Sequence, residues 1–369
     1  MKKVIIFGFT DCFGGVEKIM LEYLLPLTDS GFCMDFCFSV DKPKYFKNIE
    51  NKFIRYKRIS HLFNIYNYFL DIYRLCKKNK YDLAYCNLAY SNIILFLALK
   101  FSGVKKIIFH SHNTNIDDDN KFKRFLMLIY HYFSRTLITN FVEIKYACSM
   151  KAYKWLYGKE CRSQENLIRN AIDLDKFIYN NSLVVEQKLK LFCENAFVIG
   201  HIGRFSYQKN HEFLINTFYE IQKKNDRARL LLIGEGLLYE NIRNLVCKLN
   251  IENKVKFVEF TTEVHKYYQI MDVFVLPSLF EGLALVCIEA QASGLKCFFS
   301  ENITKEAKVS DLVKFLPLNK SVNDWAEQIL SVEGYKRKND KESLRKAGYD
   351  LSEQKLIFSK TLQEILKSS

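Results

Sequence analysis

The chain has 369 residues, 49% of them hydrophobic and 26% charged, and it contains only 14 Gly and 4 Pro. These figures exclude a disordered, collagen-like or linker-rich protein, and the length suggests two domains that each bury a core. Lys and Arg outnumber Asp and Glu by 14 charges, most of them within residues 1–175, so the charge suits nucleic acid, an anionic membrane surface or phosphorylated substrates.

Short runs of strand-forming residues alternate with longer amphipathic segments, a pattern typical of parallel sheets with crossover helices. In the first half we expect strands at 3–9, 33–39, 82–86, 106–110 and 142–148, and helices at about 15–28, 62–79, 90–101 and 121–137. In the second half we expect strands at 197–202, 228–233, 255–258, 272–276, 296–299 and 313–316. Helices there are expected at about 210–224, 237–249, 263–270, 283–293 and 321–331, with a last one at about 351–366.

The two series predict an α/β protein made of two doubly wound, Rossmann-like domains. Residues 170–173 and the weakly patterned stretch 175–195 are interpreted as the connection. The first domain is therefore expected over 1–175 and the second over 176–350, with a C-terminal helix in 351–369 that packs back on the first domain.

The cysteines and the apolar runs indicate a cytosolic chain. The 11 Cys show no CxxC spacing, so all are interpreted as reduced thiols. The opening MKKVIIFGF is too short an apolar run for a signal peptide and is interpreted as a buried strand. The longest apolar stretches, Ile93 to Leu99 and Phe125 to Ile129, fall well short of the roughly 20 residues that span a bilayer.

Two loops of the first half follow predicted strands, where open α/β sheets bind their ligands. Gly14 and Gly15 permit close backbone approach and precede a helix whose first N–H groups suit an anion, although the loop is not a GxGxxG motif. His110 and His112 alternate along an extended segment and so lie on one side of it. They are interpreted as groups that orient a sugar hydroxyl or act near a developing charge, or else as strand-end histidines with a structural role.

Two loops of the second half carry charged side chains in the same position. Arg204 and Lys209 follow the strand at 197–202 and can neutralise a diphosphate without a metal, unless both are simply solvated cations. Glu281 follows a proline turn after the strand at 272–276, and Glu289 lies about two turns down the next helix. Two carboxylates on an anion-binding helix are explained if a sugar and a ribose, both rich in hydroxyl donors, flank the phosphate.

These residues resemble a known family. GRFSYQKN (203–210), LLIGEG (231–236), the run over 271–294 and the Glu281-x7-Glu289 spacing are similar to the nucleotide-binding domain of retaining GT-B glycosyltransferases of family 4. The Gly14–Glu17 loop, HSHN (110–113) and NAID (170–173) resemble its other signatures, and HSHN with 303–319 resembles a capsule and exopolysaccharide subgroup. The resemblance covers essentially the whole chain and implies a GT-B fold whose two domains face a central cleft.

The resemblance implies that a hexose-type sugar passes from a nucleotide diphosphate, a UDP-sugar in expectation, to a glycan or polyprenyl-diphosphate-linked acceptor with retention of configuration. No cofactor and no metal are implied, and the DDD run at 117–119 is interpreted as solvated. Carried over residue by residue, the catalytic positions are His112 and Glu281. The substrate-binding positions are Gly14, Gly15, His110, Arg204, Lys209, Gly282, Leu283, Ala284 and Glu289.

Within this set the resemblance gives distinct roles. Arg204 and Lys209 stabilise the leaving diphosphate, Glu281 binds sugar hydroxyls and Glu289 binds the ribose. The amides of Gly282 and Leu283 and the backbone of Gly15 meet the diphosphate, and either His112 or His110 lies at the reacting end of the donor sugar. Ala284 departs from the family's usual glycine, which predicts a narrower sugar pocket.

The acceptor is expected to bring the protein to a membrane. Segment 121–137 mixes Lys121, Lys123, Arg124 and Arg135 with aromatic residues, and segment 52–80 places Arg55, Lys57 and Arg58 before an aromatic helix. Such stretches suit the anionic inner face of the cell membrane. The alternative is an ordinary crossover helix with a basic outer face.

Three other functions stay open at this point. A nucleotide-sugar epimerase on the same fold is one, and a sugar- or nucleotide-binding assembly protein without turnover is another. A nucleic-acid binder is the third, and it is disfavoured because no recognition motif accompanies the charge.

Overall fold

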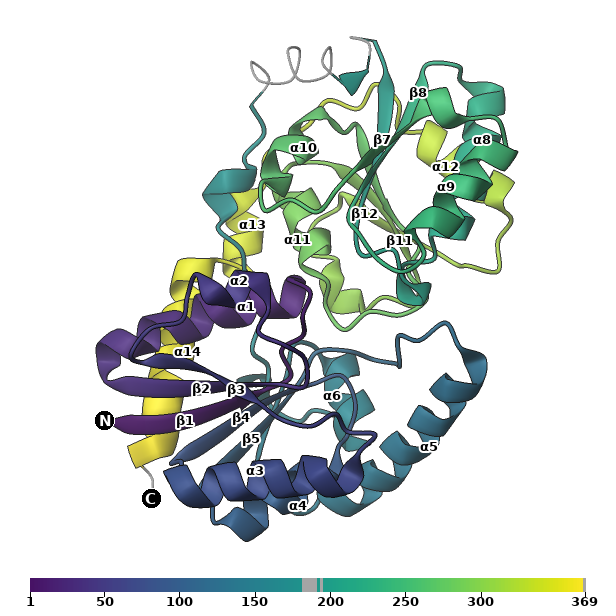
Figure 1. Cartoon of the computed structure of the whole chain (residues 1–369). Helices are drawn as coiled ribbons and strands as arrows, with labels where there is room; N and C mark the ends of the chain where they lie inside the picture. The colour runs from purple at the N-terminus through teal and green to yellow at the C-terminus, as the bar shows by residue number, and fades with distance from the viewer. Residues whose placement is uncertain (181–190, 193–194, 368–369) are drawn as a thin grey trace. The chain divides into compact units, whose positions relative to one another are not determined.

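The computed structural model describes residues 1–180, 191–192 and 195–367. The chain forms two compact units (Figure 1). The first consists of Met1–Ile116, Lys121–Asn170 and Ser352–Ser369, and the second of Asp117–Asn120 and Ala171–Leu351. The boundary between the two units therefore lies at Asn170 rather than at the predicted residue 175, and the first unit also includes the end of the chain.

The first unit is built on a six-stranded parallel sheet with the order β3-β2-β1-β4-β5-β6. Its strands run mostly through buried, apolar residues, as expected when helices cover both faces of a parallel sheet. In chain order they are β1 (Lys2–Phe7), β2 (Phe32–Phe38), β3 (Ile54–Arg58), β4 (Leu83–Leu88), β5 (Lys106–Ser111) and β6 (Ile144–Ala147).

Three helices of the first unit begin at polar caps and end at residues with positive φ. Asn64, Asn92 and Ser149 each accept a backbone N–H of the first turn that follows them. Figure 1 shows α3 and α4 together on one side of the sheet and α1 and α14 on the other. The helices are α1 (Gly15–Leu24), α2 (Lys44–Lys47), α3 (Ile65–Asn79), α4 (Ile93–Ser102), α5 (Lys121–Ile138), α6 (Met150–Tyr157) and α14 (Leu351–Lys367).

The C-terminal helix α14 packs on the first sheet through aromatic contacts. The ring of Phe358 stacks on Tyr23 of α1 at 5.2 Å and meets Tyr85 of β4 edge-on at 5.7 Å. Such pairs add about 0.5–1.5 kcal/mol beyond the area they bury. Residues from the two ends of the sequence therefore share one core.

The second unit repeats the topology, with the parallel order β12-β11-β10-β7-β8-β9. Its strands are β7 (Phe197–Ile202), β8 (Ala228–Ile233), β9 (Val255–Val258), β10 (Val273–Leu276), β11 (Lys296–Ser300) and β12 (Val313–Leu316). The helices are α8 (His211–Lys224), α9 (Tyr239–Lys248), α10 (Val264–Ile270), α11 (Leu285–Ala292), α12 (Val322–Leu330) and α13 (Lys341–Lys346). The predicted α/β fold with two Rossmann-like sheets is confirmed.

The strand predictions in the second unit agree with the structure to within one residue, whereas the first unit differs in several places. The predicted helix at 15–28 ends at Leu24 and continues as a 3₁₀ turn, because Pro26 cannot extend an α-helix. Strand β3 and helices α2, α6 and α13 were not predicted. The sequence of β3, IRYKR, is too polar to resemble a buried strand, and it forms an edge that pairs with β2 alone.

Strand β3 also corrects the interpretation of Arg55, Lys57 and Arg58 as the cations of a membrane face. The Nε of Arg55 lies 2.6 Å from Oδ1 of Asp35, and the Nζ of Lys57 lies 3.8 Å from Oδ2 of that same fully buried carboxylate. Arg58 pairs with Asp41. The three cations serve ion pairs within the first unit, which a charge count along the sequence does not reveal. No helix in the described part of the chain is both long enough and apolar enough to cross a membrane.

Candidate active site

The second unit has a topological switch point between β7 and β10. From these neighbouring strands the chain order runs outward in both directions, through β8 and β9 on one side and β11 and β12 on the other. In open α/β sheets ligands bind beyond the carboxyl ends of such a pair. The two charged loops predicted from the sequence, after Ile202 and after Leu276, both lie at this position.

An ion pair joins the two loops. The Nζ of Lys209 donates to Oε1 of Glu281 at 2.6 Å, and the Nε2 of Gln208 donates to Oε2 of that carboxylate at 2.8 Å. Only 5% of Glu281 is exposed, and Lys209 is largely buried as well. A buried pair with both carboxylate oxygens occupied holds its geometry, so the ammonium and the carboxylate are preorganised for a ligand.

Backbone contacts lock the same two loops together. Gln208 accepts the N–H of Leu279 through its carbonyl oxygen at 2.8 Å, and its side chain donates to the carbonyl of Phe280 at 2.9 Å. The side chain of Asn210 donates to the carbonyl of Pro277 at 3.1 Å. Four hydrogen-bonding groups on residues 208–210, the ammonium of Lys209 among them, thus hold the loop against the segment that contains Glu281.

Arg204 differs from Lys209 in its surroundings. It is exposed, and it forms no ion pair within the parts of the chain that the structure describes. An exposed guanidinium without an ion-pair partner gives up no ion pair within the protein when it binds a phosphate group in a bidentate manner. Close to it, a Cβ on Gly234 would lie 2.2 Å from the carbonyl oxygen of Gly203, so only glycine permits the loops after β7 and β8 to approach this closely.

Helix α11 begins at Leu285, two residues later than predicted, with Ala284 as its N-cap. Gly282 and Leu283 are therefore buried loop residues rather than the first residues of the helix. The prediction that their amides belong to the helix N-terminus is wrong, because the chain stays non-helical through Ala284. The amides still lie directly beside Glu281 in the sequence.

Glu289 lies inside the protein, with 2% of its surface exposed. It accepts the hydroxyl of Tyr268 from α10 at 3.1 Å. Burial, followed by the charge of Glu289, raises the pKa of Tyr268 well above its usual value, so this hydroxyl remains a donor. The carboxylate is oriented by a neighbouring helix in a way that the sequence spacing did not suggest.

Two buried histidines stiffen the end of β7. The Nδ1 of His201 donates to the carbonyl of Val275 at 2.8 Å, which ties β7 to β10 exactly where the ion pair follows. The ring of His211 packs 4.7 Å from it. Desolvation lowers the pKa of His201 to about 3, so this ring is neutral near pH 7.

In the first unit Glu17 organises the glycine loop. Its carboxylate accepts the backbone N–H of Thr10 at 3.0 Å, the hydroxyl of Thr10 at 2.9 Å and the N–H of Gly14 at 3.0 Å. Helix α1 begins at Gly15, which is exposed at the carboxyl edge of the sheet. The loop therefore presents backbone at this edge, and a buried carboxylate fixes its shape.

His110 and His112 lie on one side of the chain, as predicted, with ring centroids 4.0 Å apart. His110 is completely buried and bonds through Nδ1 to the hydroxyl of Tyr85 at 2.8 Å. This burial does not support the predicted substrate contact of His110, whereas His112 is partly exposed.

Asn87 of β4 determines how His112 is protonated. Its Nδ2 donates to the carbonyl of Phe7 at 3.1 Å, so its Oδ1 accepts from Nε2 of His112 at 2.9 Å. Desolvation lowers the pKa of His112 to about 3. The ring is thus neutral with its proton on Nε2, and Nδ1 is an acceptor that has no partner among the described residues.

Four residues that hold the site in place were not predicted from the sequence: Glu17, Asn87, Gln208 and Tyr268. Gln208 stands inside the GRFSYQKN motif, next to Lys209, and Glu17 stands inside the Gly14–Glu17 loop, so both could have been examined there. Asn87 and Tyr268 act from neighbouring elements, β4 and α10. No local pattern marks them.

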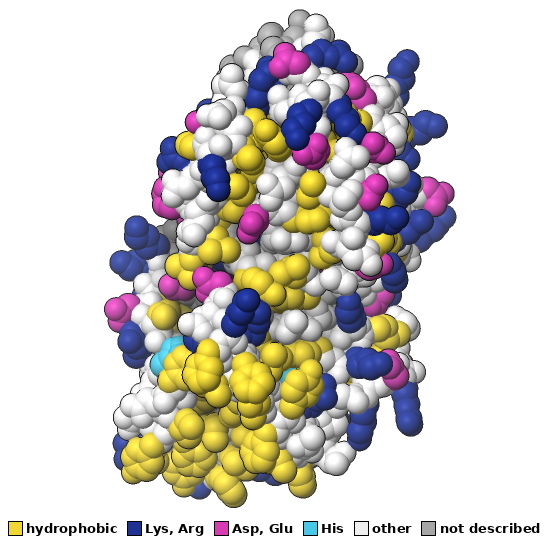
Figure 2. All heavy atoms as spheres, turned by 90° about the vertical axis from the view of Figure 1, so that its right-hand side faces the viewer, with side chains coloured by type: hydrophobic (Ala, Val, Ile, Leu, Met, Phe, Trp, Pro, Cys, Tyr) yellow, Lys and Arg dark blue, Asp and Glu magenta, His cyan; other side chains and the backbone are white. Residues whose placement is uncertain are grey.

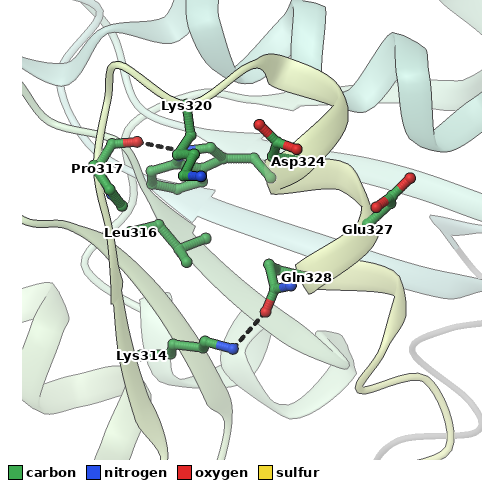
Figure 3. Close-up of a pocket in the computed structure, with 8 residues that line it drawn as sticks. Lys314, Leu316, Pro317, Lys320, Asp324, Glu327 and Gln328 are labelled. Carbon is green, nitrogen blue, oxygen red and sulfur yellow. Dashed lines mark hydrogen bonds between the residues drawn. The ribbon is translucent and has the colours of Figure 1, made fainter.

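Two further features bear on ligand binding. In the described residues no group of three or more His, Cys, Asp or Glu could hold a metal ion. A pocket of about 300 Å³ opens between β12 and α12 (Figure 3). Several of its polar groups already have partners, since Lys314 donates to Gln328 and the indole of Trp325 donates to the carbonyl of Pro317. It lies at the edge strand of the sheet, so we assign it no role.

The family described as "Glycosyl transferases group 1" matches residues 186–350. EpsF of Bacillus subtilis, named as a glycosyltransferase, is 34% identical over 69% of this chain and 67% of its own length. The Escherichia coli UDP-Gal:alpha-D-GlcNAc-diphosphoundecaprenol alpha-1,3-galactosyltransferase is 25% identical over 63% of this chain and 60% of its own length. The structure of HepE from Anabaena with UDP-glucose has a TM-score of 0.73 at 17% identity, covering 100% of both chains.

Proposed function

The chain belongs to the glycosyl transferases group 1 family, and from this premise we propose that it transfers a sugar from a UDP-sugar to a lipid-diphosphate-linked glycan, with retention of configuration. The donor is supported by the likeness to HepE, whose structure contains UDP-glucose. The acceptor is supported by the galactosyltransferase relative, whose name specifies a diphosphoundecaprenol substrate. The product would enter a surface polysaccharide such as a capsule or exopolysaccharide.

The observation that carries this proposal is the buried Lys209–Glu281 pair at the switch point of the second sheet. Negative charge grows on the diphosphate as the glycosidic bond breaks. A fixed ammonium beside it, with the exposed Arg204 as a second cation, stabilises that charge more in the transition state than in the ground state. Glu281 accepts sugar hydroxyls while Lys209 and Gln208 hold it in place.

The same cations make a metal unnecessary for binding the diphosphate, so the proposal is of a metal-independent transferase. Glu289, oriented by Tyr268, is assigned to the ribose hydroxyls. In the first unit the neutral Nδ1 of His112, which is buried and has no hydrogen-bond partner among the described residues, is assigned to a hydroxyl of the donor sugar. Neutrality matters here, because an imidazolium would have no acceptor to offer.

The proposal places the chain as a peripheral protein at the cytoplasmic face of the membrane. Nucleotide sugars are water-soluble, whereas a polyprenyl diphosphate stays in the bilayer. An enzyme that joins the two works at the boundary between them.

The test is sugar transfer in EDTA, with UDP-, GDP- and ADP-sugars and a lipid-diphosphate acceptor extract. We expect product with a UDP-sugar. Lys209→Met should lower kcat about 10²–10³-fold, the range for removing one preorganised charge donor. Lys223→Met is the matched control and should leave kcat unchanged, because Lys223 forms an exposed pair with Glu220.

Three outcomes would contradict the proposal. Full dependence on added Mn²⁺ would refute the metal-independent mechanism. Conversion of a UDP-sugar to its epimer without acceptor would identify an epimerase. Tight UDP binding with no turnover of any donor would favour a binding protein.

A further inference from the structure

Helix α5 of the first unit has its apolar face turned outward. The residues that it buries are His131, Ser134 and Ile138. The opposite face carries large exposed side chains at helical spacing, among them Phe122 at 71% exposure, Phe125 at 58% and Phe133 at 60%. In an ordinary amphipathic helix the apolar face packs on the core, so this helix reverses the expected pattern.

Specific polar contacts hold α5 in this orientation. The Nδ1 of His131 accepts the backbone N–H of Ser91 at 3.0 Å, and the His131 ring stacks on Trp155 with centroids 3.9 Å apart. The hydroxyl of Tyr130 donates to Oδ1 of Asn92 at 2.8 Å. Desolvation lowers the pKa of His131 to about 3, so its ring stays neutral and remains an acceptor. The outward face is therefore a fixed feature of the fold.

The exposed face continues beyond α5. Phe63, Ile65 and Tyr66 at the start of α3 are also exposed, and the Nζ of Lys123 lies 5.9 Å from the ring centroid of Phe63. Figure 2 shows hydrophobic side chains gathered in the lower part of the view. We call the aromatic face the set Phe63, Ile65, Tyr66, Phe122, Phe125, Leu126, Ile129 and Phe133.

The charge on α5 indicates what covers the aromatic face. The helix contains Lys121, Lys123, Arg124 and Arg135 and no Asp or Glu, and of these Arg135 donates to the carbonyl of Trp155 within the first unit. Aromatic side chains bordered by cations on one helix are typical of segments that lie in the interface of an anionic bilayer. A second copy of the chain suits this face poorly, because a two-fold interface would oppose identical cations.

The position of the aromatic face links it to the site of the first unit. Helix α5 follows the loop that begins with His112, and it docks on Ser91 and Asn92, a few residues beyond Asn87. Helix α3 likewise follows the carboxyl end of β3. The aromatic face therefore borders the carboxyl edge of the first sheet, where His112 lies.

We propose that the aromatic face inserts into the headgroup region of an anionic membrane and thereby brings the carboxyl edge of the first sheet to the lipid surface. The docking itself is independent of catalysis. Delivery of a lipid-diphosphate acceptor to this edge rests on the function proposed above.

The test is co-sedimentation of the full chain with vesicles of phosphatidylcholine, with and without phosphatidylglycerol. We expect binding that requires the anionic lipid. The double variant Phe125→Ser/Phe133→Ser should bind at least tenfold more weakly, because each exposed ring loses its apolar burial in the membrane. Lys121→Gln/Arg124→Gln should weaken binding by about tenfold or more and make it less sensitive to salt. Leu356→Ser, on the exposed part of α14, is the matched control and should bind like the parent chain.

Transfer to a water-soluble acceptor analogue separates this proposal from the proposed function. The variants that weaken vesicle binding should keep this transfer activity. Conversely, a chain without any transferase activity would still bind vesicles. Equal binding of the Phe125→Ser/Phe133→Ser variant and the parent would overturn the proposal, as would equal pelleting with neutral vesicles. A dimer in solution that this variant dissociates, with no vesicle binding, would assign the face to a second copy. Absence of both would leave a protein as the occupant and equally refute the membrane.

Discussion

The two units share one strand order but differ in their surfaces. Of the exposed large apolar side chains among the described residues, all but Ile178, Leu237 and Phe260 belong to the first unit. The second unit instead concentrates its charged motif residues at the switch point between β7 and β10. Two copies of one topology thus differ in their surfaces and in their loop residues. The sheet and its helices determine where the loops lie but not which side chains the loops contain.

The units also differ in how their site residues are held. In the second, charged side chains of two neighbouring loops bind each other directly. In the first, His112 is positioned from a different strand, by Asn87 of β4. Three perturbations test how these two arrangements are held.

The largest effect is expected from acid. Burial lowers the pKa of His131 in the first unit and of His201 in the second to about 3, from an ordinary value near 6.5. The unfolded chain then binds more protons between these values, so stability is complete above pH 6.5 and falls as the pH drops towards 3. At pH 5 each of the two histidines lowers the free energy of unfolding by about 2 kcal/mol relative to its value above pH 6.5. The pKa values of His110, His112 and His211 are lowered too, and their effect has the same sign.

Thermal unfolding between pH 8 and pH 5, followed by calorimetry, measures this loss. We expect Tm to fall from about pH 6.5 downward, with both units affected because each contains such histidines. A Tm that stays constant down to pH 5 would show that the histidines are protonated in the native state.

The second effect is confined to the first unit. Gly8 has φ +89°, and a Cβ there would lie 1.8 Å from the carbonyl oxygen of Asn87. Gly8→Ala should therefore cost about 3–5 kcal/mol of unfolding free energy. Gly31 is the matched control, because its φ is +83° and no described atom lies within 4 Å of its Cβ position. Gly31→Ala should cost only about 1 kcal/mol.

Denaturant unfolding of both glycine variants tests this difference. We expect Gly8→Ala to lower the unfolding midpoint of the first unit by more than Gly31→Ala does. Equal costs for the two substitutions would show that the backbone near Asn87 relaxes.

The smallest effect concerns the roles of the two units. Asn87→Ala removes the acceptor that keeps the proton of His112 on Nε2, so kcat for transfer should fall about tenfold. The affinity for UDP should not change, because Arg204 and Lys209, the cations assigned to the diphosphate, belong to the second unit. Steady-state kinetics with calorimetric titration of UDP measures both quantities. A variant that loses UDP affinity instead would place Asn87 in donor binding.

The sequence by itself determined the elements and motifs that depend on neighbouring residues. Buried parallel strands such as β7 and β8 are continuous apolar runs, so their bounds could be predicted. The Lys209 and Glu281 loops could be predicted too, because both follow such strands and carry the family's motifs.

Tertiary structure decided what depends on residues distant in the sequence. Strand β3 could not be predicted because Arg55 and Lys57 are neutralised by Asp35, about 20 residues earlier. That His110 is buried and that His112 contacts Asn87 follows only from the fold. The pattern of α5 showed an amphipathic helix, but only its contacts with Ser91 and Trp155 fixed which face points outward. Periodicity defines two faces of a helix, and packing alone decides which of them meets the core.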